Sequence, residues 1–288
     1  MDANGLLIID KPAGLTSHQV VGRVRRVYGT RKVGHAGTLD PMATGVLIVG
    51  LNRATRLLGH LALHDKAYRA TIRLGASSST DDAEGELSSR LDASGLSQDA
   101  IQAATGPFRG EIMQRPSTVS AIKVDGKRAY ARARAGEEVN LASRPVVVSR
   151  FEIVGMHLEP PWCDVDVEVE CSSGTYVRAL ARDLGQALGV GGHLSMLRRI
   201  RIGAYGLDRA VELDDCEAST PLMSMAEAAR LSFPVVTVDD QAARDVGFGR
   251  SLDVAVPGDP TGIVGPGGDL LALYRPEGQQ ARPVAVLT

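Results

Sequence analysis

The sequence predicts an α+β protein whose last part is a small domain of short strands. Two segments, Tyr68–Leu74 and Val165–Cys171, alternate apolar and polar residues as half-buried strands do. Two others, residues 17–28 and 176–188, carry apolar residues at helical spacing. From about Pro234 the chain consists of short apolar runs separated by many glycines and prolines, which is typical of a small all-β domain.

The first expected elements are a short strand and a helix. Leu6–Ile9 is an apolar run that predicts a buried strand, and a cluster of turn-forming residues follows it. Thr16 or Ser17 can cap the next helix, because either hydroxyl can accept a hydrogen bond from the N–H groups of the first turn. Gly29 is a natural stop for this helix.

A glycine-rich stretch, Gly34–Gly45, predicts a loop that leads into the apolar strand Val46–Val49. Glycine permits backbone conformations closed to other residues and a close approach to a ligand. Pro41 biases Asp40 towards an extended backbone, which would aim its carboxylate in a fixed direction. The stretch is therefore a candidate catalytic loop, although the same residue types also form ordinary turns.

The later elements follow the same rules. Thr175 is the expected cap of the second helix, which Gly189 should end. Residues 113–145 are polar and basic without clear strand periodicity, so we expect an excursion from the core. The runs Leu270–Tyr274 and Pro283–Leu287 are the expected last strands.

The composition is that of a soluble globular protein. The 288 residues are 44% hydrophobic, and 32 Lys+Arg against 34 Asp+Glu leave a formal net charge of −2. The longest apolar run, Gly45–Leu51, is far shorter than the ~20 residues of a membrane-spanning helix. A secretory signal would require a positive charge before its apolar run, and none precedes the short run Leu6–Ile9. We therefore expect a cytoplasmic protein that has no membrane partner.

Common metal and cofactor motifs are missing from the sequence. Cys163, Cys171 and Cys216 lie too far apart for a metal knuckle and are expected to be small buried apolar residues. The histidines show no metal-ligand spacing, and the signatures of dinucleotide, P-loop and serine-hydrolase sites are absent. We expect neither a metal nor a cofactor.

The small net charge hides a strong segregation. Residues 1–60 hold eight Lys+Arg against three Asp+Glu, and residues 111–150 hold eight against four. Residues 216–288, in contrast, hold five against nine. Arg198, Arg199 and Arg201 form a further basic cluster. Such segments are often only solvated faces, but they also suit a nucleic-acid partner.

Gly34–Gly45 resembles the catalytic motif of the pseudouridine synthases, in the branch that makes pseudouridine 55 in the TΨC arm of tRNA. Further segments resemble other motifs of this family in the expected order. They are Asp10–Ser17 (first motif), Lys66–Tyr68 (tyrosine-bearing strand), Ser120–Lys123 with Gly126–Tyr130 (RNA-binding thumb), Ser173–Arg178 (arginine motif) and Leu197–Arg199 (late core strand). Their joint occurrence over roughly residues 5–205 is far more specific than any single match.

The resemblance implies a mixed, largely antiparallel sheet flanked by helices. It implies a catalytic domain over residues 1–233, with the thumb inserted at about 113–145, and a small PUA-like β-barrel over 234–288. The thumb departs from the family pattern. Gln114-Arg115-Pro116 is followed by Ser117, where the family usually has a second proline and then an aromatic residue.

The resemblance also implies three catalytic residues. Asp40 matches the carboxylate nucleophile, and Arg178 matches a guanidinium partner that would hold the pKa of this carboxylate low. Tyr68 matches the tyrosine proposed to stack on the flipped base and to serve the later C5 proton transfer. Because the isomerisation involves no net oxidation or reduction, it needs no redox cofactor. The sequence leaves open whether Asp40 attacks C6, attacks C1′ or assists a glycal intermediate.

The same resemblance implies residues that bind the substrate. Tyr176 should line the pocket, Leu197 should form its apolar wall, and His35 should fill the space left by the flipped nucleotide. Lys11 should brace the site rather than enter the reaction. The remaining substrate-binding residues are the cations Lys123, Arg198 and Arg199.

The expected substrate is the TΨC stem-loop of tRNA, and the family suggests a monomer without an obligatory protein partner. Two alternatives stay open. The segregated basic charge also fits a tRNA-binding or tRNA-folding protein whose pocket is not its main contribution. Some relatives keep the chemistry but act on another RNA with a guide RNA and protein partners.

Overall fold

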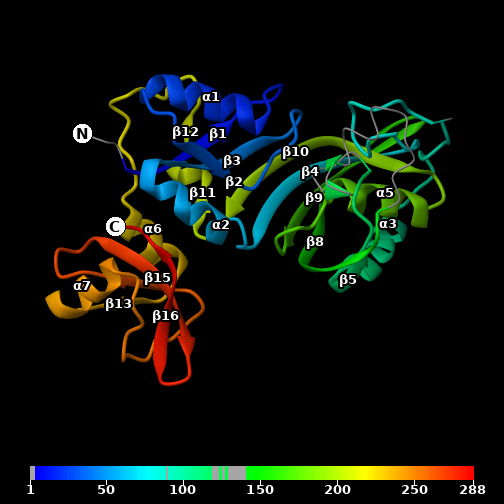
Figure 1. Cartoon of the computed structure of the whole chain (residues 1–288). Coiled ribbons are helices and arrows are strands. Elements are labelled where there is room, and N and C mark those ends of the chain that lie inside the picture. Colours follow the sequence, from blue (N-terminus) through cyan, green and yellow to red (C-terminus); the bar gives the residue numbers. More distant parts are fainter. Residues whose placement is uncertain (1–3, 89, 119–122, 125–126, 129–140) are drawn as a thin grey trace. The chain divides into compact units, whose positions relative to one another are not determined.

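The computed structural model describes residues 4–88, 90–118, 123–124, 127–128 and 141–288 (Figure 1). These residues fall into two compact units. The first unit comprises Met1–Pro41, Gly45–Leu63 and Ile202–Thr288, and the second comprises Met42–Thr44 and His64–Arg201.

The first unit is built around two long central strands. β1 (Gly5–Lys11) pairs antiparallel with β3 (Thr44–Leu51) along its whole length, from Gly5 opposite Leu51 to Lys11 opposite Gly45. The short strand β12 (Val211–Glu212) adds to β1 in parallel, and β2 (Val33–Ala36) adds to β3 antiparallel. Other short elements of this unit are η1 (Asn52–Leu57), α2 (Leu58–Leu61), β11 (Tyr205–Gly206) and η3 (Leu207–Arg209).

Both faces of β1 and β3 are covered, which explains why these strands are continuous apolar runs rather than alternating ones. On one face, Leu7 and Ile9 pack with Val20 and Val24 of α1 (Ser17–Val27). On the other face, the core includes residues of α2, of α6 (Met225–Ser232) and of the C-terminal strands. α1 begins after Thr16, which forms a capping box with Gln19, so the predicted helix and its cap are confirmed.

The C-terminal part, orange to red in Figure 1, contains four strands and one helix. The sheet order is β13-β14-β15-β16, formed by Val235–Thr237, Thr261–Val264, Leu270–Glu277 and Gln280–Val286. Helix α7 (Asp240–Gly247) follows β13, so the expectation of an all-β domain is wrong. The helix buries Val246 but has only eight residues, and the glycines and prolines around it favoured short strands in the sequence. No closed barrel is found among these fully described residues, whose sheet has β13 and β16 at its two ends.

The second unit contains a sheet of order β10-β4-β9-β8-β5. The strands are β10 (Gly192–Ile202), β4 (Lys66–Leu74), β9 (Trp162–Cys171), β8 (Arg144–Glu159) and β5 (Gly110–Gln114). β4, β9, β8 and β5 pair antiparallel in turn. Together with the parallel β1–β12 pair of the first unit, this confirms the predicted α+β class with a mixed, largely antiparallel sheet.

Helices cover the apolar face of this second sheet. α5 (Val177–Ala187) packs against β4 and against α3 (Gln98–Thr105), which is followed by η2 (Gly106–Phe108). The polar face of β4 and β9 carries cross-strand ion pairs, such as Arg73 with Asp164 at 2.6 Å and Arg69 with Glu168 at 3.2 Å. The alternation seen in the sequence therefore marks one apolar and one charged face, as predicted.

Two local expectations need correction. The stretch Gly34–Gly45 is not a loop throughout, because its first residues belong to β2 and are held by pairing with β3. Thr175 is not the cap of α5. Its hydroxyl donates to the carbonyl of Ser172 at 3.0 Å, closing a turn, and Tyr176 occupies the cap position without a side-chain cap.

In the part of the chain that the structure describes, no helix could span a membrane.

Candidate active site

Asp40 lies in a loop whose backbone is held on both sides. Before it, Ser17 Oγ accepts a hydrogen bond from the N–H of Leu39 at 2.9 Å and donates one to its carbonyl at 3.2 Å. After it, the carbonyl of Pro41 accepts a hydrogen bond from the N–H of Gly14 at 2.8 Å. The first sequence motif therefore anchors the loop of the candidate nucleophile, which is a physical reason for the two motifs to occur together.

Lys11 strengthens the same anchor from inside the protein. Its side chain is fully buried at the end of β1. Its Nζ donates to the carbonyls of Pro12 at 2.8 Å, Leu15 at 2.6 Å and Pro41 at 3.2 Å. An ammonium that binds three backbone carbonyls holds the turn and the loop together.

His35 lies on β2, in the same unit as Asp40. Its ring packs edge-to-face against the ring of His18 on α1, with centroids 5.4 Å apart and an interplanar angle of 82°. This contact orients the His35 side chain relative to α1.

Arg178, the second residue of α5, forms a buried ion pair in the second unit. Its Nη1 lies 3.2 Å from Asp82 Oδ2 and donates to the carbonyl of Thr80 at 2.8 Å. Both charged side chains are only 4% exposed. The carboxylate of Asp82 also accepts from Thr80 Oγ1 at 2.5 Å and from the N–H of Glu84 at 3.1 Å. The guanidinium is therefore held in one orientation.

Asp82 was missed in the sequence. A second pair lies beside it, since Arg182 Nη1 is 3.1 Å from Asp81 Oδ2. Two arginines one helical turn apart thus meet two consecutive aspartates. The adjacent acids in the run Thr80-Asp81-Asp82 were the available signal, but nothing local indicated that their partners lie on a distant helix.

The other predicted pocket residues of the second unit come from three elements. Tyr68 of β4 is 7% exposed and Leu197 of β10 is 6% exposed. Tyr176 is half-buried at the start of α5. Tyr68, Leu197, Tyr176 and Arg178 therefore share one unit, whereas Asp40, His35 and Lys11 belong to the other.

The basic cluster on β10 is largely engaged within the protein. Arg198 donates to Thr44 Oγ1 at 3.3 Å, and Arg199 is only 1% exposed. Arg201 pairs with Asp65 at 2.8 Å and with Glu170 at 3.0 Å. This cluster therefore presents less charge to a ligand than the sequence suggested.

Lys123 lies on β6 (Lys123–Val124), which pairs antiparallel with β7 (Lys127–Arg128). The thumb-motif residues Ser120–Ile122, Gly126, Ala129 and Tyr130 lie outside the described residues.

Lys66, which is 6% exposed, provides a prediction about pH. Burial, together with the nearby charge of Arg199, lowers the pKa of Lys66 to about 8. In the unfolded chain a lysine pKa is about 10.4, so the unfolded state binds more protons between these values and the free energy of unfolding rises with pH there. Relative to Lys66→Met, the wild type should gain about 1–2 kcal/mol between pH 7 and 9.5 in urea unfolding. Parallel pH profiles for the two proteins would contradict this prediction.

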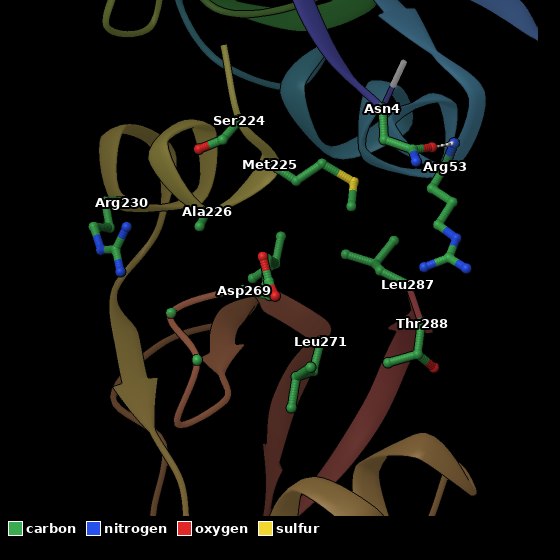
Figure 2. A pocket seen from close by; sticks show the side chains of 13 residues that line it. Asn4, Arg53, Ser224, Met225, Ala226, Arg230, Asp269, Leu271, Leu287 and Thr288 are labelled. Atoms are coloured by element: carbon green, nitrogen blue, oxygen red, sulfur yellow. Dashed lines mark hydrogen bonds between the residues drawn. The ribbon is translucent and has the colours of Figure 1, made fainter. Parts of the chain in front are cut away.

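A pocket of 440 Å³ lies within the first unit, between α6, the turn before β15 and the last residues of the chain (Figure 2). Arg53 and Arg230 lie on opposite sides of it, and Met225, Leu271 and Leu287 supply apolar lining. None of the predicted site residues lines this pocket.

Across the described ranges, no three His, Cys, Asp or Glu side chains gather as a metal site would require.

Solved structures share the fold of this chain. A Cbf5-Nop10-Gar1 complex contains a chain that matches with a TM-score of 0.74 and 28% identity, over 99% of this chain and 85% of that chain. A chain of an H/ACA RNP bound to a substrate RNA containing 2′-deoxyuridine matches with a TM-score of 0.72 and 27% identity, with the same coverage. The mixed sheet and its helices therefore form a pseudouridine synthase fold.

Sequence comparisons define the family. The N-terminal domain of TruB family pseudouridylate synthases matches residues 25–177. The C-terminal domain of tRNA pseudouridylate synthase B matches residues 178–232, and the C-terminal domain of tRNA pseudouridine synthase II matches 233–288. The chain is similar to the tRNA pseudouridine synthase B of Cutibacterium acnes, with 59% identity over 99% of this chain and 98% of that protein. It is also similar to that of Mycolicibacterium paratuberculosis, with 54% identity over 100% and 98%. The chain belongs to the TruB family of pseudouridylate synthases.

Proposed function

We propose that this protein converts uridine 55 in the TΨC arm of tRNA to pseudouridine. The observation that carries the proposal is the match to relatives named tRNA pseudouridine synthase B over essentially the whole chain. The anchored loop of Asp40 supports it, because a nucleophile must be held in a fixed direction before the base reaches it.

In this proposal the uridine is first flipped out of the arm and stacks on Tyr68. Asp40 acts as the ionised nucleophile while the N1–C1′ bond breaks, the base turns and the C5–C1′ bond forms. Tyr68 serves the removal of the C5 proton. Arg178 is the guanidinium partner of Asp40 during the reaction, and its buried pair with Asp82 orients it for that role. Tyr176, Leu197 and His35 surround the flipped nucleotide.

The test of this function is turnover by the pure protein. A TΨC stem-loop without any guide RNA should be converted completely at substoichiometric enzyme. Product limited to one equivalent, or RNA binding without product, would favour the tRNA-binding or tRNA-folding alternative. Activity that needs added RNA and protein partners would favour a guided reaction. The structural relatives belong to a Cbf5-Nop10-Gar1 complex and to an H/ACA RNP bound to a substrate RNA.

RNA binding should depend on exposed cations of the first unit. Arg26, Arg31 and Lys32 are exposed, and no ion pair joins them to an acidic residue among the described residues. Affinity for the stem-loop should fall with salt, because such contacts displace counterions from phosphates. Combining Arg31→Gln with Lys32→Gln should lower the slope of log K against log[salt] by about one per lost phosphate contact.

The control for this measurement is Arg282→Gln, which removes an exposed arginine that is paired with Glu277 at 2.6 Å. Its salt slope should equal that of the wild type. An unchanged slope in the double variant would place the RNA elsewhere.

We further propose that residues 1–233 form the catalytic domain, with the thumb at about 113–145. Residues 234–288 form the small PUA-like β domain, and the match of a distinct family model to residues 233–288 supports this division. We propose that the protein acts in the cytoplasm as a monomer without an obligatory protein partner. Sedimentation of the active protein, with and without the stem-loop, should give the mass of one chain; the mass of two or more chains would refute the monomer.

A further inference from the structure

Gln114, the last residue of β5, holds the backbone at the start of α5. The residue is only 1% exposed. Gln114 Oε1 accepts a hydrogen bond from the N–H of Tyr176 at 2.8 Å, and Gln114 Nε2 donates one to the carbonyl of Tyr176 at 3.0 Å. One planar amide therefore binds both backbone polar groups of the residue that caps α5. No side chain of its own turn caps this helix. The two hydrogen bonds with Gln114 therefore define where the helix begins.

Arg144 holds the same segment from the neighbouring strand. It is the register partner of Gln114 across the β5–β8 pair. Its guanidinium donates to the carbonyl of Gly174 and lies over the ring of Tyr176, 4.9 Å from the ring centroid. Both the backbone and the ring of Tyr176 are thus fixed by residues at the ends of the two strands that flank the predicted thumb.

A third contact ties the same strand end to α5. Arg182 Nη2 donates to the carbonyl of Arg115 at 2.8 Å, while its Nη1 pairs with Asp81. The strand end at Gln114 and Arg115 therefore contacts both the start and the second turn of α5. Arg178 lies between these two contacts along the helix.

We propose that Gln114 is a positioning residue for the isomerisation, setting Tyr176 and, through the start of α5, Arg178. This inference rests on the proposed function. Tyr176 has an extended backbone, with φ −105° and ψ 108°, and helical geometry begins at the next residue. A rotation at this junction redirects the Tyr176 ring and displaces Arg178 together. The amide prevents the rotation because it blocks movement of the N–H and the carbonyl at once.

Only an amide meets both requirements at this position. Glutamate keeps an acceptor for the Tyr176 N–H, but its carboxylate faces the Tyr176 carbonyl without a proton to donate. Leucine offers neither function at similar size. Asparagine keeps both functions on a side chain that is one methylene shorter.

The experiment compares single-turnover rate constants and dissociation constants on one TΨC stem-loop. Gln114→Leu and Gln114→Glu should lower the rate constant by about 10- to 100-fold, since small displacements of reacting groups have effects of this size. The dissociation constant should change by less than about threefold, because Gln114 is buried and the affinity for RNA rests mainly on exposed cations that bind phosphates. Gln114→Asn should recover part of the rate lost in Gln114→Leu.

Met113→Leu is the matched control, because Met113 precedes Gln114 on β5 and is 66% exposed. It should leave both constants unchanged. Unchanged rates in the Gln114 variants, equal rates for the Asn and Leu variants, or a rate loss matched by weaker binding would overturn the proposal. An inactive wild type would instead refute the proposed function, so the two failures are distinguishable.

Discussion

Asp40→Asn should abolish turnover of a TΨC stem-loop, with a loss of at least about 10⁴-fold in single-turnover rate. The amide has nearly the shape of the carboxylate but lacks its charge and its nucleophilic oxygen. The loop is anchored by the hydrogen bond from the Leu39 N–H to Ser17 Oγ. It is also anchored by the Pro41 carbonyl, which accepts hydrogen bonds from the Gly14 N–H and from Lys11 Nζ. None of them uses the Asp40 side chain, so the loop should keep its conformation.

The thermal unfolding midpoint and the RNA dissociation constant of this variant should therefore stay close to those of the wild type. Asp208→Asn is the matched control, because Asp208 is in the same unit and its side chain is 77% exposed. This control should retain full activity. If Asp40→Asn retained turnover, Asp40 would not be the nucleophile.

Arg178→Lys should reduce the single-turnover rate by about 10²-fold or more, since an ammonium cannot reproduce the planar contacts of a guanidinium. In the wild type, the Arg178 guanidinium binds both Asp82 Oδ2 and the carbonyl of Thr80. A lysine ammonium is a single point of charge on a flexible stem, so it cannot hold these two acceptors in the planar geometry of the guanidinium. A variant with wild-type rate would show that this guanidinium is not needed.

The variant Asp82→Asn removes the carboxylate that pairs with Arg178, and its main expected effect is on stability. It should lower the free energy of unfolding by about 3 kcal/mol, because it replaces the carboxylate of a buried ion pair by a neutral amide beside the Arg178 charge. Arg69→Lys is the control for Arg178→Lys, since Arg69 is 64% exposed and pairs with Glu168 on the charged face of the sheet. Urea unfolding and the single-turnover rate should both be unaffected in this control.

Much of the architecture could be predicted because it depends on local patterns. The alternation in β4 and β9, and the capped amphipathic pattern of α1, are each visible within about ten residues of sequence. β2 and α7 were missed for different physical reasons. β2 is only four residues long and depends on its pairing with β3. α7 is only eight residues long and lies in a segment rich in glycine and proline, where the pattern favoured strands.

The candidate site shows the same division. Asp40, Tyr68 and Arg178 lie in motifs whose residues are consecutive, so a resemblance could locate them. Asp82 and Gln114 act on α5 from segments far away in the sequence, and only tertiary structure brings each pair together. The burial of Arg199 was equally hidden, because a run of arginines is usually exposed.

The decisive experiment for the proposed function is the mapping of pseudouridine in full-length tRNA after incubation with the pure protein. The proposed function predicts near-complete pseudouridine at position 55 and none at other uridines. The tRNA treated with Asp40→Asn should show none at any position. Absence of pseudouridine at position 55 in the wild-type reaction, or its formation at a different site, would refute this activity.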